Sequence, residues 1–270
     1  NATFVPLMVP LLIACPIGAM MVWKRGDLAG VVGRLKVAVG LAGLVVLATV
    51  MIDGNTDIVA ALAMGVAAWL VTGAAVDLAE RTGLFRISFS ETLRRAANLP
   101  RSAWGTAIAH SALGIMVAGI TASSSWQTER IQIVRLGDTV ELAGYEVTFR
   151  GAANVSGPNY SALRGTFDLT ANGRKITTLH PEKRDYPAEK SSTTEAAIHT
   201  TPIADVYVVL GYSDGKGGWA ARMYHNPLVP WIWAGAIFMA IGGMVSLSDR
   251  RLRVGAPKRA AHKTPAAEVA

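Results

Sequence analysis

Cysteine is nearly absent from the 270-residue sequence, since Cys15 is the only one. A single cysteine excludes an intramolecular disulfide and a CxxC redox or zinc site. Cys15 lies inside an apolar stretch, where we expect a small buried residue and not a reactive thiol.

Charged residues are also scarce. They make up 17% of the sequence against 51% for apolar residues, and the mean hydropathy is +0.34. These values are typical of a membrane protein. Sequence motifs of soluble catalysts are missing too: there is no HExxH, no GxSxG and no glycine-rich phosphate loop. Hydrolase and nucleotide-binding functions therefore have no support.

The sequence begins with Asn1 and enters an apolar stretch without a preceding basic region. This pattern does not fit a signal peptide. We expect a fragment of a longer protein, in preference to a protein with a trimmed N-terminus.

Five stretches are long and apolar enough for a transmembrane helix, which needs about 20 residues. They cover residues 2–22, 35–52, 58–79, 103–122 and 227–247. The second is the shortest, and the third contains Asp77, which we expect to pair with Arg81 one helical turn later. The sequence thus predicts a polytopic α-helical membrane protein with five transmembrane helices.

The net charge of +7 comes from short segments beside these stretches. Basic residues dominate segments 23–36, 80–102 and 250–270, whereas the 53–57 loop has acids and no base. Because positive loops stay on the cytoplasmic side, we expect residues 123–226 outside and the basic tail, 250–270, in the cytoplasm. The same distribution argues against a nucleic-acid partner.

Residues 123–226 show a different pattern. Apolar and polar residues alternate in stretches such as 145–150 and 204–210, and turn signals such as Asn172-Gly173 separate them. This pattern predicts a small antiparallel β domain, either a barrel or a sandwich. Residues 181–201 lack the alternation, and we expect a long loop with a short helix there.

One short segment predicts a helix outside the membrane spans. Residues 90–100 begin with Ser90 as an N-cap and place leucine and alanine on one side and arginines on the other. We expect either an interfacial helix on the cytoplasmic surface or a solvated connecting helix. The chain then divides into transmembrane helices with a cytoplasmic loop and this helix (1–122), the β domain (123–226), a last transmembrane helix (227–249) and the basic tail (250–270).

A histidine lies in the middle of an apolar span. In WGTAIAHSALGIMVAGI, residues 104–120, only His110 can ionise. Such a residue is costly in a membrane and usually faces the protein interior. Small residues one turn away, such as Ala107 and Gly114, leave room for a flat group or a neighbouring helix. Since neutral imidazole is a good iron ligand, three roles stay open: haem ligation, a proton or ion relay, and helix packing.

The remaining histidines have no metal-ligand spacing. His180, His199 and His225 are scattered through the expected β domain, and His262 lies in the basic tail. We assign none of them a ligand role.

Several short stretches together resemble one family. They are NATFVPLMVPLL (1–12), NLPRSAWG (98–105), AHSALG (109–114), GPNY (157–160), PEKRDY (181–186), TEAAI (194–198), ADVYVVLG (204–211), GGWAARMYHNPLVPWIW (217–233) and GAIFMAIGGMVSLSDRR (235–251). In this order they resemble the C-terminal part of the CcmF family of cytochrome c haem lyases, over essentially the whole sequence.

The resemblance implies an enzyme of the bacterial inner membrane. Such a thioether-forming lyase attaches haem, its substrate, to the CxxCH thiols of apocytochrome c in the periplasm, as part of a complex and not completely within this chain. The family also holds a b-type haem in the membrane between two histidines, and the second corresponds to His110. The resemblance thus implies His110 as an axial ligand of a haem b that reduces the incoming haem. It assigns no catalytic residue.

The resemblance also implies partners. They are membrane lipid, the N-terminal part of the lyase in the same or a separate chain, the haem chaperone CcmE, apocytochrome c with its presenting subunits CcmH and CcmI, and quinol as electron source. The tryptophan-rich motif that receives haem, two flanking histidines and the other haem b ligand belong to that N-terminal part.

The β domain then either covers the haem site or docks the apocytochrome-presenting partner. Lys183, Arg184 and Arg222 pair either with haem propionates or with acids of their own domain. Trp231 and Trp233 are expected in an interfacial aromatic belt.

An alternative from another class is a non-catalytic membrane scaffold whose periplasmic domain recruits partners. His110 would then serve helix packing or proton conduction. A b-type haem distinguishes the two hypotheses.

Overall fold

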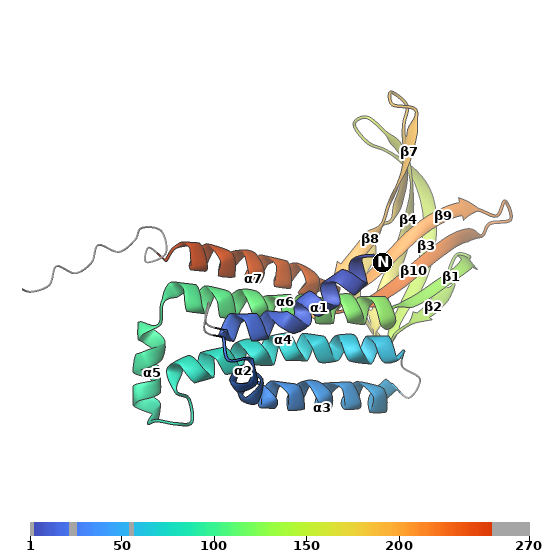
Figure 1. The fold of residues 1–270 in the computed structure, drawn as a ribbon. Coiled ribbons are helices and arrows are strands. Elements are labelled where there is room, and N and C mark those ends of the chain that lie inside the picture. The colour runs from blue at the N-terminus through green and yellow to red at the C-terminus, as the bar shows by residue number, and fades with distance from the viewer. Residues whose placement is uncertain (1–2, 22–25, 54–56, 250–270) are drawn as a thin grey trace, which may run out of the picture.

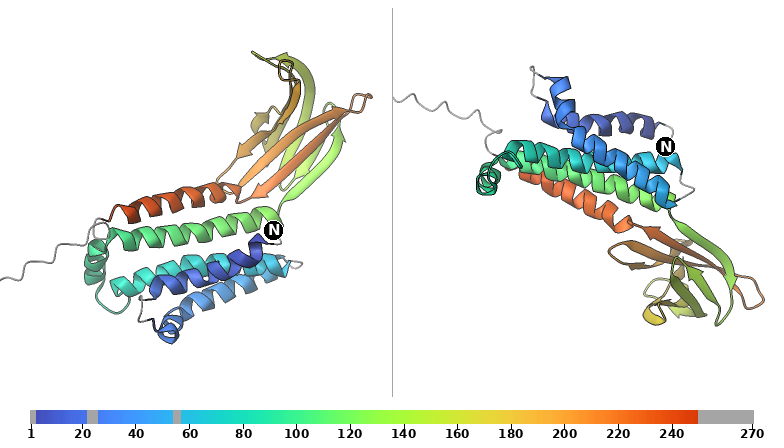
Figure 2. Two further views of the ribbon diagram at one scale, coloured as in Figure 1. Left: turned by 45° about the horizontal axis from the view of Figure 1, so that its top comes forward. Right: turned by 90° about the horizontal axis from the view of Figure 1, so that it is seen from below.

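A helical bundle with a β-sandwich at one end forms the computed structural model, which describes residues 3–21, 26–53 and 57–249 (Figure 1). Along the bundle run α1 (Phe4–Met20), α3 (Lys36–Asp53), α4 (Ile58–Thr82), α6 (Arg101–Ser125) and α7 (Val229–Leu247). Two shorter helices, α2 (Leu28–Arg34) and α5 (Phe89–Asn98), lie at the end away from the sandwich (Figures 1 and 2).

The helices confirm the apolar stretches, although not all to the expected length. Within the described ranges, α4, α6 and α7 are each long and apolar enough to cross a membrane. Helices α2 and α3 pass the same test only as a pair, which bends by 54° at the break between them. Helix α1 is a shorter apolar helix of 17 residues with Pro10 and Pro16 inside it.

Helix α5 begins earlier than expected. Its N-cap is Ser88 and not Ser90, because the first helical hydrogen bond runs from the Thr92 backbone N–H to the Ser88 carbonyl. The helix lies across the end of the bundle (Figures 1 and 2).

Two antiparallel sheets make up the β-sandwich, which is inserted between α6 and α7. One has the order β1-β10-β9-β8 and the other β2-β3-β4-β6-β7, with β5 paired to β4. The strands are β1 (Thr128–Val134), β2 (Thr139–Leu142), β3 (Tyr145–Ser156), β4 (Ser161–Ala171), β5 (Arg174–Leu179), β6 (Glu182–Tyr186), β7 (Ser191–Glu195), β8 (Ala197–Thr200), β9 (Ala204–Ser213) and β10 (Trp219–Pro227).

Alternating apolar residues fill the space between the sheets, as the sequence predicts. Phe149 and Phe167 lie at the centre, with ring centroids 4.9 Å apart, and Val206 and Leu210 face them from the other sheet. The β4–β5 hairpin turns at Asn172-Gly173, where both residues have positive φ, at 49° and 70°. This is the two-residue turn that an Asn-Gly pair favours.

The expected loop and short helix at 181–201 are wrong. This segment forms β6, β7 and β8: β6 pairs with β4 and β7, and β8 pairs with β9. Strand β7 has the sequence SSTTE and buries no side chain fully. Backbone hydrogen bonds to β6 hold this strand in place. Because they do not depend on the side chains, the sequence of β7 shows no alternation of apolar and polar residues.

Glycine brings the backbones of α6 and α7 into contact. A Cβ atom added to Gly242 would lie 2.7 Å from the Ala109 nitrogen and from the Gly105 carbonyl oxygen. One added to Gly235 would lie 2.9 Å from the Ala112 carbonyl oxygen. Such close approach maximises dispersion contacts, which drive helix association in lipid.

This contact predicts that substitutions at two adjacent glycines, Gly242 and Gly243, differ greatly in their effect on stability. Gly242→Leu forces the backbones apart and should lower the stability of the chain by about 1–3 kcal/mol or more. Gly243→Leu is the matched control, because a Cβ there meets no atom within 4 Å. Thermal unfolding of the purified chain in detergent measures both, and an equal loss in the two variants would contradict the packing.

A cluster of ion pairs and hydrogen bonds around Asp168 lies on the surface of the sandwich. The Asp168 carboxylate accepts hydrogen bonds from Lys175 (2.6 Å), Arg150 (2.8 Å) and Thr178 (2.9 Å). These hydrogen bonds hold the pKa of Asp168 well below its ordinary range. The bond from Lys175 has the largest effect, followed by those from Arg150 and Thr178. A carboxylate with a depressed folded-state pKa adds stability above its unfolded pKa and loses it as pH falls.

We therefore expect Asp168→Asn to lower the free energy of unfolding at pH 7 by about 1 kcal/mol, since its partners are partly exposed. The difference from the unmodified chain should shrink as pH falls below about 4, the unfolded pKa of aspartate. Glu146→Gln, an exposed carboxylate on the neighbouring strand β3, is the control. Thermal unfolding across pH 3–7 tests this, and a difference that grows toward low pH would refute it.

Candidate functional site

His110 lies near the middle of α6, at a point where this helix has three different neighbours. The α7 side carries Gly105 and Ala109, and the α4 side carries Ala107 and Gly114. A Cβ added to Gly114 would lie 2.7 Å from the Ala67 carbonyl oxygen of α4. The small residues near His110 therefore accommodate a neighbouring helix, one of the two options that the sequence left open.

The imidazole itself faces α1 across an apolar hollow of about 470 Å³. This volume falls within the range of ordinary ligand sites. Besides His110, its lining consists of Met8, Leu11, Leu12, Ala14, Cys15, Gly18, Ala19 and Leu113.

The lining defines what the hollow can do chemically. His110 supplies its only nitrogen-bearing side chain, and Met8 and Cys15 supply sulfur. His110 is half-buried, and no group in the described ranges hydrogen bonds to its ring. A half-buried imidazole with both nitrogens available can ligate a metal, and the apolar walls suit the face of a flat, hydrophobic ligand.

Within the described residues no group of three or more histidine, cysteine or acidic side chains is arranged to hold a metal ion. Within this part of the chain, His110 is therefore an isolated candidate ligand and not a member of a metal-binding cluster.

An ion pair occupies the same bundle on α4. Asp77 is 6% exposed, and the Arg81 guanidinium donates to both of its carboxylate oxygens at 2.9 Å. This confirms the expected pairing one helical turn apart. The buried carboxylate thus has its charge compensated from its own helix.

Comparisons with known proteins agree with one another. A family model described as the CcmF C-terminal beta-sandwich matches residues 125–227. The chain is 46% identical over 264 residues to the cytochrome c-type biogenesis protein CycK of Bradyrhizobium diazoefficiens. The matched region covers 97% of this chain and 40% of CycK. It is 32% identical over 255 residues to the cytochrome c-type biogenesis protein CcmF of Escherichia coli, covering 94% of this chain and 38% of that protein.

The chain belongs to the CcmF family. It spans about two fifths of the length of the curated CcmF relatives that it matches. A solved structure titled cytochrome c heme lyase CcmF has the same fold, with a TM-score of 0.69 at 21% identity, over 92% of this chain and 40% of that one.

Two of the short CcmF-like stretches meet on the sandwich. Tyr160 of GPNY and Tyr186 of PEKRDY have ring centroids 5.6 Å apart, and the Arg184 guanidinium lies 4.5 Å from the Tyr160 ring centroid. Glu182, which is 5% exposed, accepts hydrogen bonds from Arg184 at 2.7 Å and Arg164 at 2.5 Å. No sequence pattern predicted this network, because its members lie around the start of β4 and in β6, which the fold brings together.

The three cations considered as haem contacts mostly bind within their own domain. Arg184 pairs with Glu182, and Arg222 pairs with Glu129 at 2.6 Å. Lys183 instead lies over the Tyr212 ring, 3.0 Å from its centroid. For the two arginines, pairing with the domain's own acids is confirmed.

His180, His199 and His225 lie in the sandwich, apart from the His110 hollow. His180 is exposed, whereas His199 and His225 are half-buried on either side of Val206 in one sheet. Burial lowers the pKa of His225, whose ring centroid is 6.1 Å from that of Tyr145. His262 lies outside the described residues.

Proposed function

We propose that this chain forms the C-terminal part of a cytochrome c haem lyase and that His110 is an axial ligand of a b-type haem in the membrane. One observation carries the proposal: an imidazole without a hydrogen-bond partner in the described chain faces an apolar, ligand-sized hollow in the bundle. Membership of the CcmF family, and relatives named for cytochrome c-type biogenesis, support the substrate class.

The proposed topology has five spans in the bacterial inner membrane, with the β-sandwich in the periplasm and residues 250–270 in the cytoplasm. Its support is the unequal charge of the two ends of the bundle. The sandwich lies at one end, while Arg34, Arg86, Arg94 and Arg101 belong to segments at the other (Figure 1). Positive segments favour the cytoplasmic side.

Two tryptophans support the same placement. Trp231 and Trp233 lie in the first turn of α7, directly below the sandwich, and Trp231 donates a hydrogen bond to the Pro202 carbonyl oxygen at 2.8 Å. Trp233 is 70% exposed. This arrangement fits an aromatic belt at the periplasmic interface.

When bound, such a haem would supply electron transfer to the incoming substrate haem, with quinol as the proposed electron source. The residues of this chain bind and orient it: His110 coordinates from α6, while Leu11, Leu12 and Leu113 exclude water from its face. Among the described residues that line the hollow there is no second histidine, and the proposal assigns the other ligand to the N-terminal part of the lyase, in the same or another chain.

Thioether formation at the CxxCH motif is proposed for the whole complex. The proposed partners are CcmE as haem donor and apocytochrome c presented by CcmH and CcmI, with the sandwich as the periplasmic surface that they meet. If His110 serves only helix packing or proton conduction, the chain is instead a non-catalytic scaffold, and no haem spectrum depends on it.

The test is the reduced-minus-oxidised absorption spectrum of the purified membrane complex. His110→Ala should remove or shift a bis-imidazole b-type spectrum and lower bound haem by about tenfold or more, since it deletes an iron ligand. His225→Ala, which removes a half-buried imidazole from the sandwich, should leave the spectrum unchanged.

A second variant tests the hollow without touching the ligand. Gly18→Leu fills the hollow, and a Cβ at Gly18 meets no atom within 4 Å, so the fold should persist while haem content falls. Gly40→Leu on α3 is the matched control, since its Cβ also meets nothing. An unchanged spectrum in His110→Ala, with the complex assembled, would remove His110 from the iron.

A further inference from the structure

Helix α5 carries an exposed apolar stripe at the end of the bundle away from the sandwich. Phe85, in the turn before the helix, is 94% exposed, Phe89 is 72% exposed and Leu93 is 54% exposed. Their spacing of four residues places Phe89 and Leu93 on one face of the helix. Three large apolar side chains in a row are costly in water, at about 25 cal/mol per Å² of exposed apolar surface.

Helix α5 is fixed in place by the bundle, so its exposed face has a defined direction. Thr92 is 7% exposed on the side toward the bundle. Trp104, in the first turns of α6, donates a hydrogen bond to the Ala96 carbonyl oxygen at 3.2 Å. The Arg95 guanidinium lies near Gly83, at the end of α4. The helix therefore lies crosswise at the depth where α4 ends and α6 begins (Figures 1 and 2).

Beside the stripe are two arginines, Arg94 and Arg101, that outnumber their acidic partners among the described residues. The Arg94 side chain is 73% exposed and shares its only acidic partner, Glu91, with Arg95. Arg101 is exposed, and it forms no ion pair with any residue of the described ranges. The segment thus has an excess of positive charge next to its apolar face.

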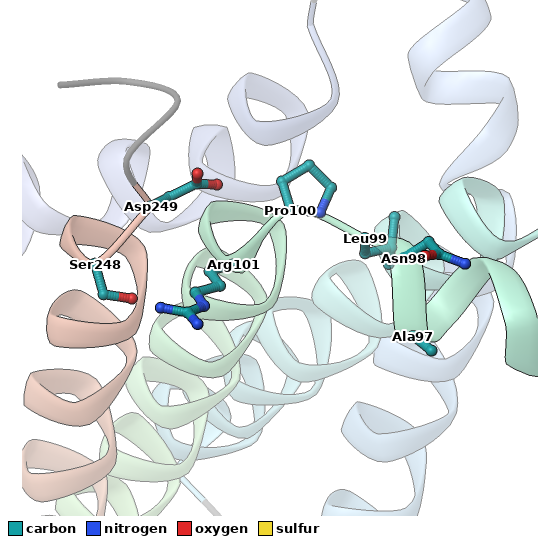
Figure 3. A pocket seen from close by; sticks show the side chains of 7 residues that line it. All are labelled: Ala97, Asn98, Leu99, Pro100, Arg101, Ser248 and Asp249. Atoms are coloured by element: carbon teal, nitrogen blue, oxygen red, sulfur yellow. The ribbon is translucent and has the colours of Figure 1, made fainter. Parts of the chain in front are cut away.

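Arg101 also lines a polar hollow of about 540 Å³, formed by Ala97, Asn98, Leu99, Pro100, Ser248 and Asp249 together with Arg101 (Figure 3). Asn98 links this hollow to Arg94, because its side-chain amide donates to the Arg94 carbonyl oxygen at 2.7 Å. The Asp249 carboxylate accepts hydrogen bonds from the Ser102 backbone N–H and hydroxyl, at 3.1 and 3.0 Å. Its negative charge is therefore directed at the first turn of α6.

We propose that α5 and this hollow bind an anionic phospholipid. The apolar stripe of Phe85, Phe89 and Leu93 enters the acyl region, and Arg94 and Arg101 contact the phosphate headgroup at the rim of the hollow. Two features favour a lipid over another occupant: the charge complements an anion, and the helix lies where membrane-long helices end, at headgroup depth. Inorganic phosphate lacks the acyl chains that the stripe requires.

Native mass spectrometry of the full chain in detergent, with added phosphatidylglycerol or phosphatidylcholine of identical acyl chains, tests this site. We expect clear preference for phosphatidylglycerol. Arg94→Gln with Arg101→Gln should weaken phosphatidylglycerol binding about thirtyfold and leave phosphatidylcholine binding unchanged, since each arginine near an anionic headgroup contributes about fivefold.

The matched control removes the same charge from the sandwich. Arg130→Gln with Arg174→Gln, two exposed arginines of β1 and β5, should retain the preference. Equal binding of the two lipids, or equal losses in the two double variants, would overturn the proposal. Displacement of phosphatidylglycerol by millimolar inorganic phosphate alone would also overturn it and assign the hollow to free phosphate.

Discussion

Helices α6 and α7 touch backbone to backbone, because glycine occupies the contact points on both. Gly105 and Gly242 meet near one end of the pair, and Gly235 meets the Ala112 carbonyl near its middle. Without a hydrophobic driving force between helices in lipid, this close contact is what holds them together. The sandwich depends on it too, since β1 leaves α6 and β10 enters α7.

The same contact decides where His110 points. With one side of α6 held against α7 and a second, at Ala107 and Gly114, held against α4, the remaining inward side faces α1. There Gly18 and Ala19 keep α1 from filling the space, and a hollow remains. Packing on two sides of a helix thus creates a cavity on the third, and the one ionisable residue in the middle of α6 lies in it.

Local pattern predicted much of this arrangement. Apolar length identified α4, α6 and α7, alternation identified β3, β4 and β9, and spacing alone predicted the Asp77–Arg81 pair. What failed was structure that the side-chain pattern does not encode. Strand β7 is held by β6 and has no apolar alternation of its own, so residues 181–201 read as a loop. Likewise, the small residues around His110 predicted close packing but not which helix lies on which side. In the structure α4 packs against Ala107 and Gly114, and the imidazole faces α1.

The two ends of the bundle differ in how their arginines are paired, and the proposed function assigns each end a different contact. At the sandwich end, Arg184 and Arg222 are bound to acids of their own domain, Glu182 and Glu129. At the other end, Arg94 and Arg101 exceed their acidic partners in the described chain and lie beside Phe89 and Leu93. In the proposed function, the end with the arginines meets the membrane surface, the sandwich end meets a polypeptide, and the middle of the bundle holds the haem. The His110 hollow lies between these two ends, within the apolar bundle, where the proposed haem would be held.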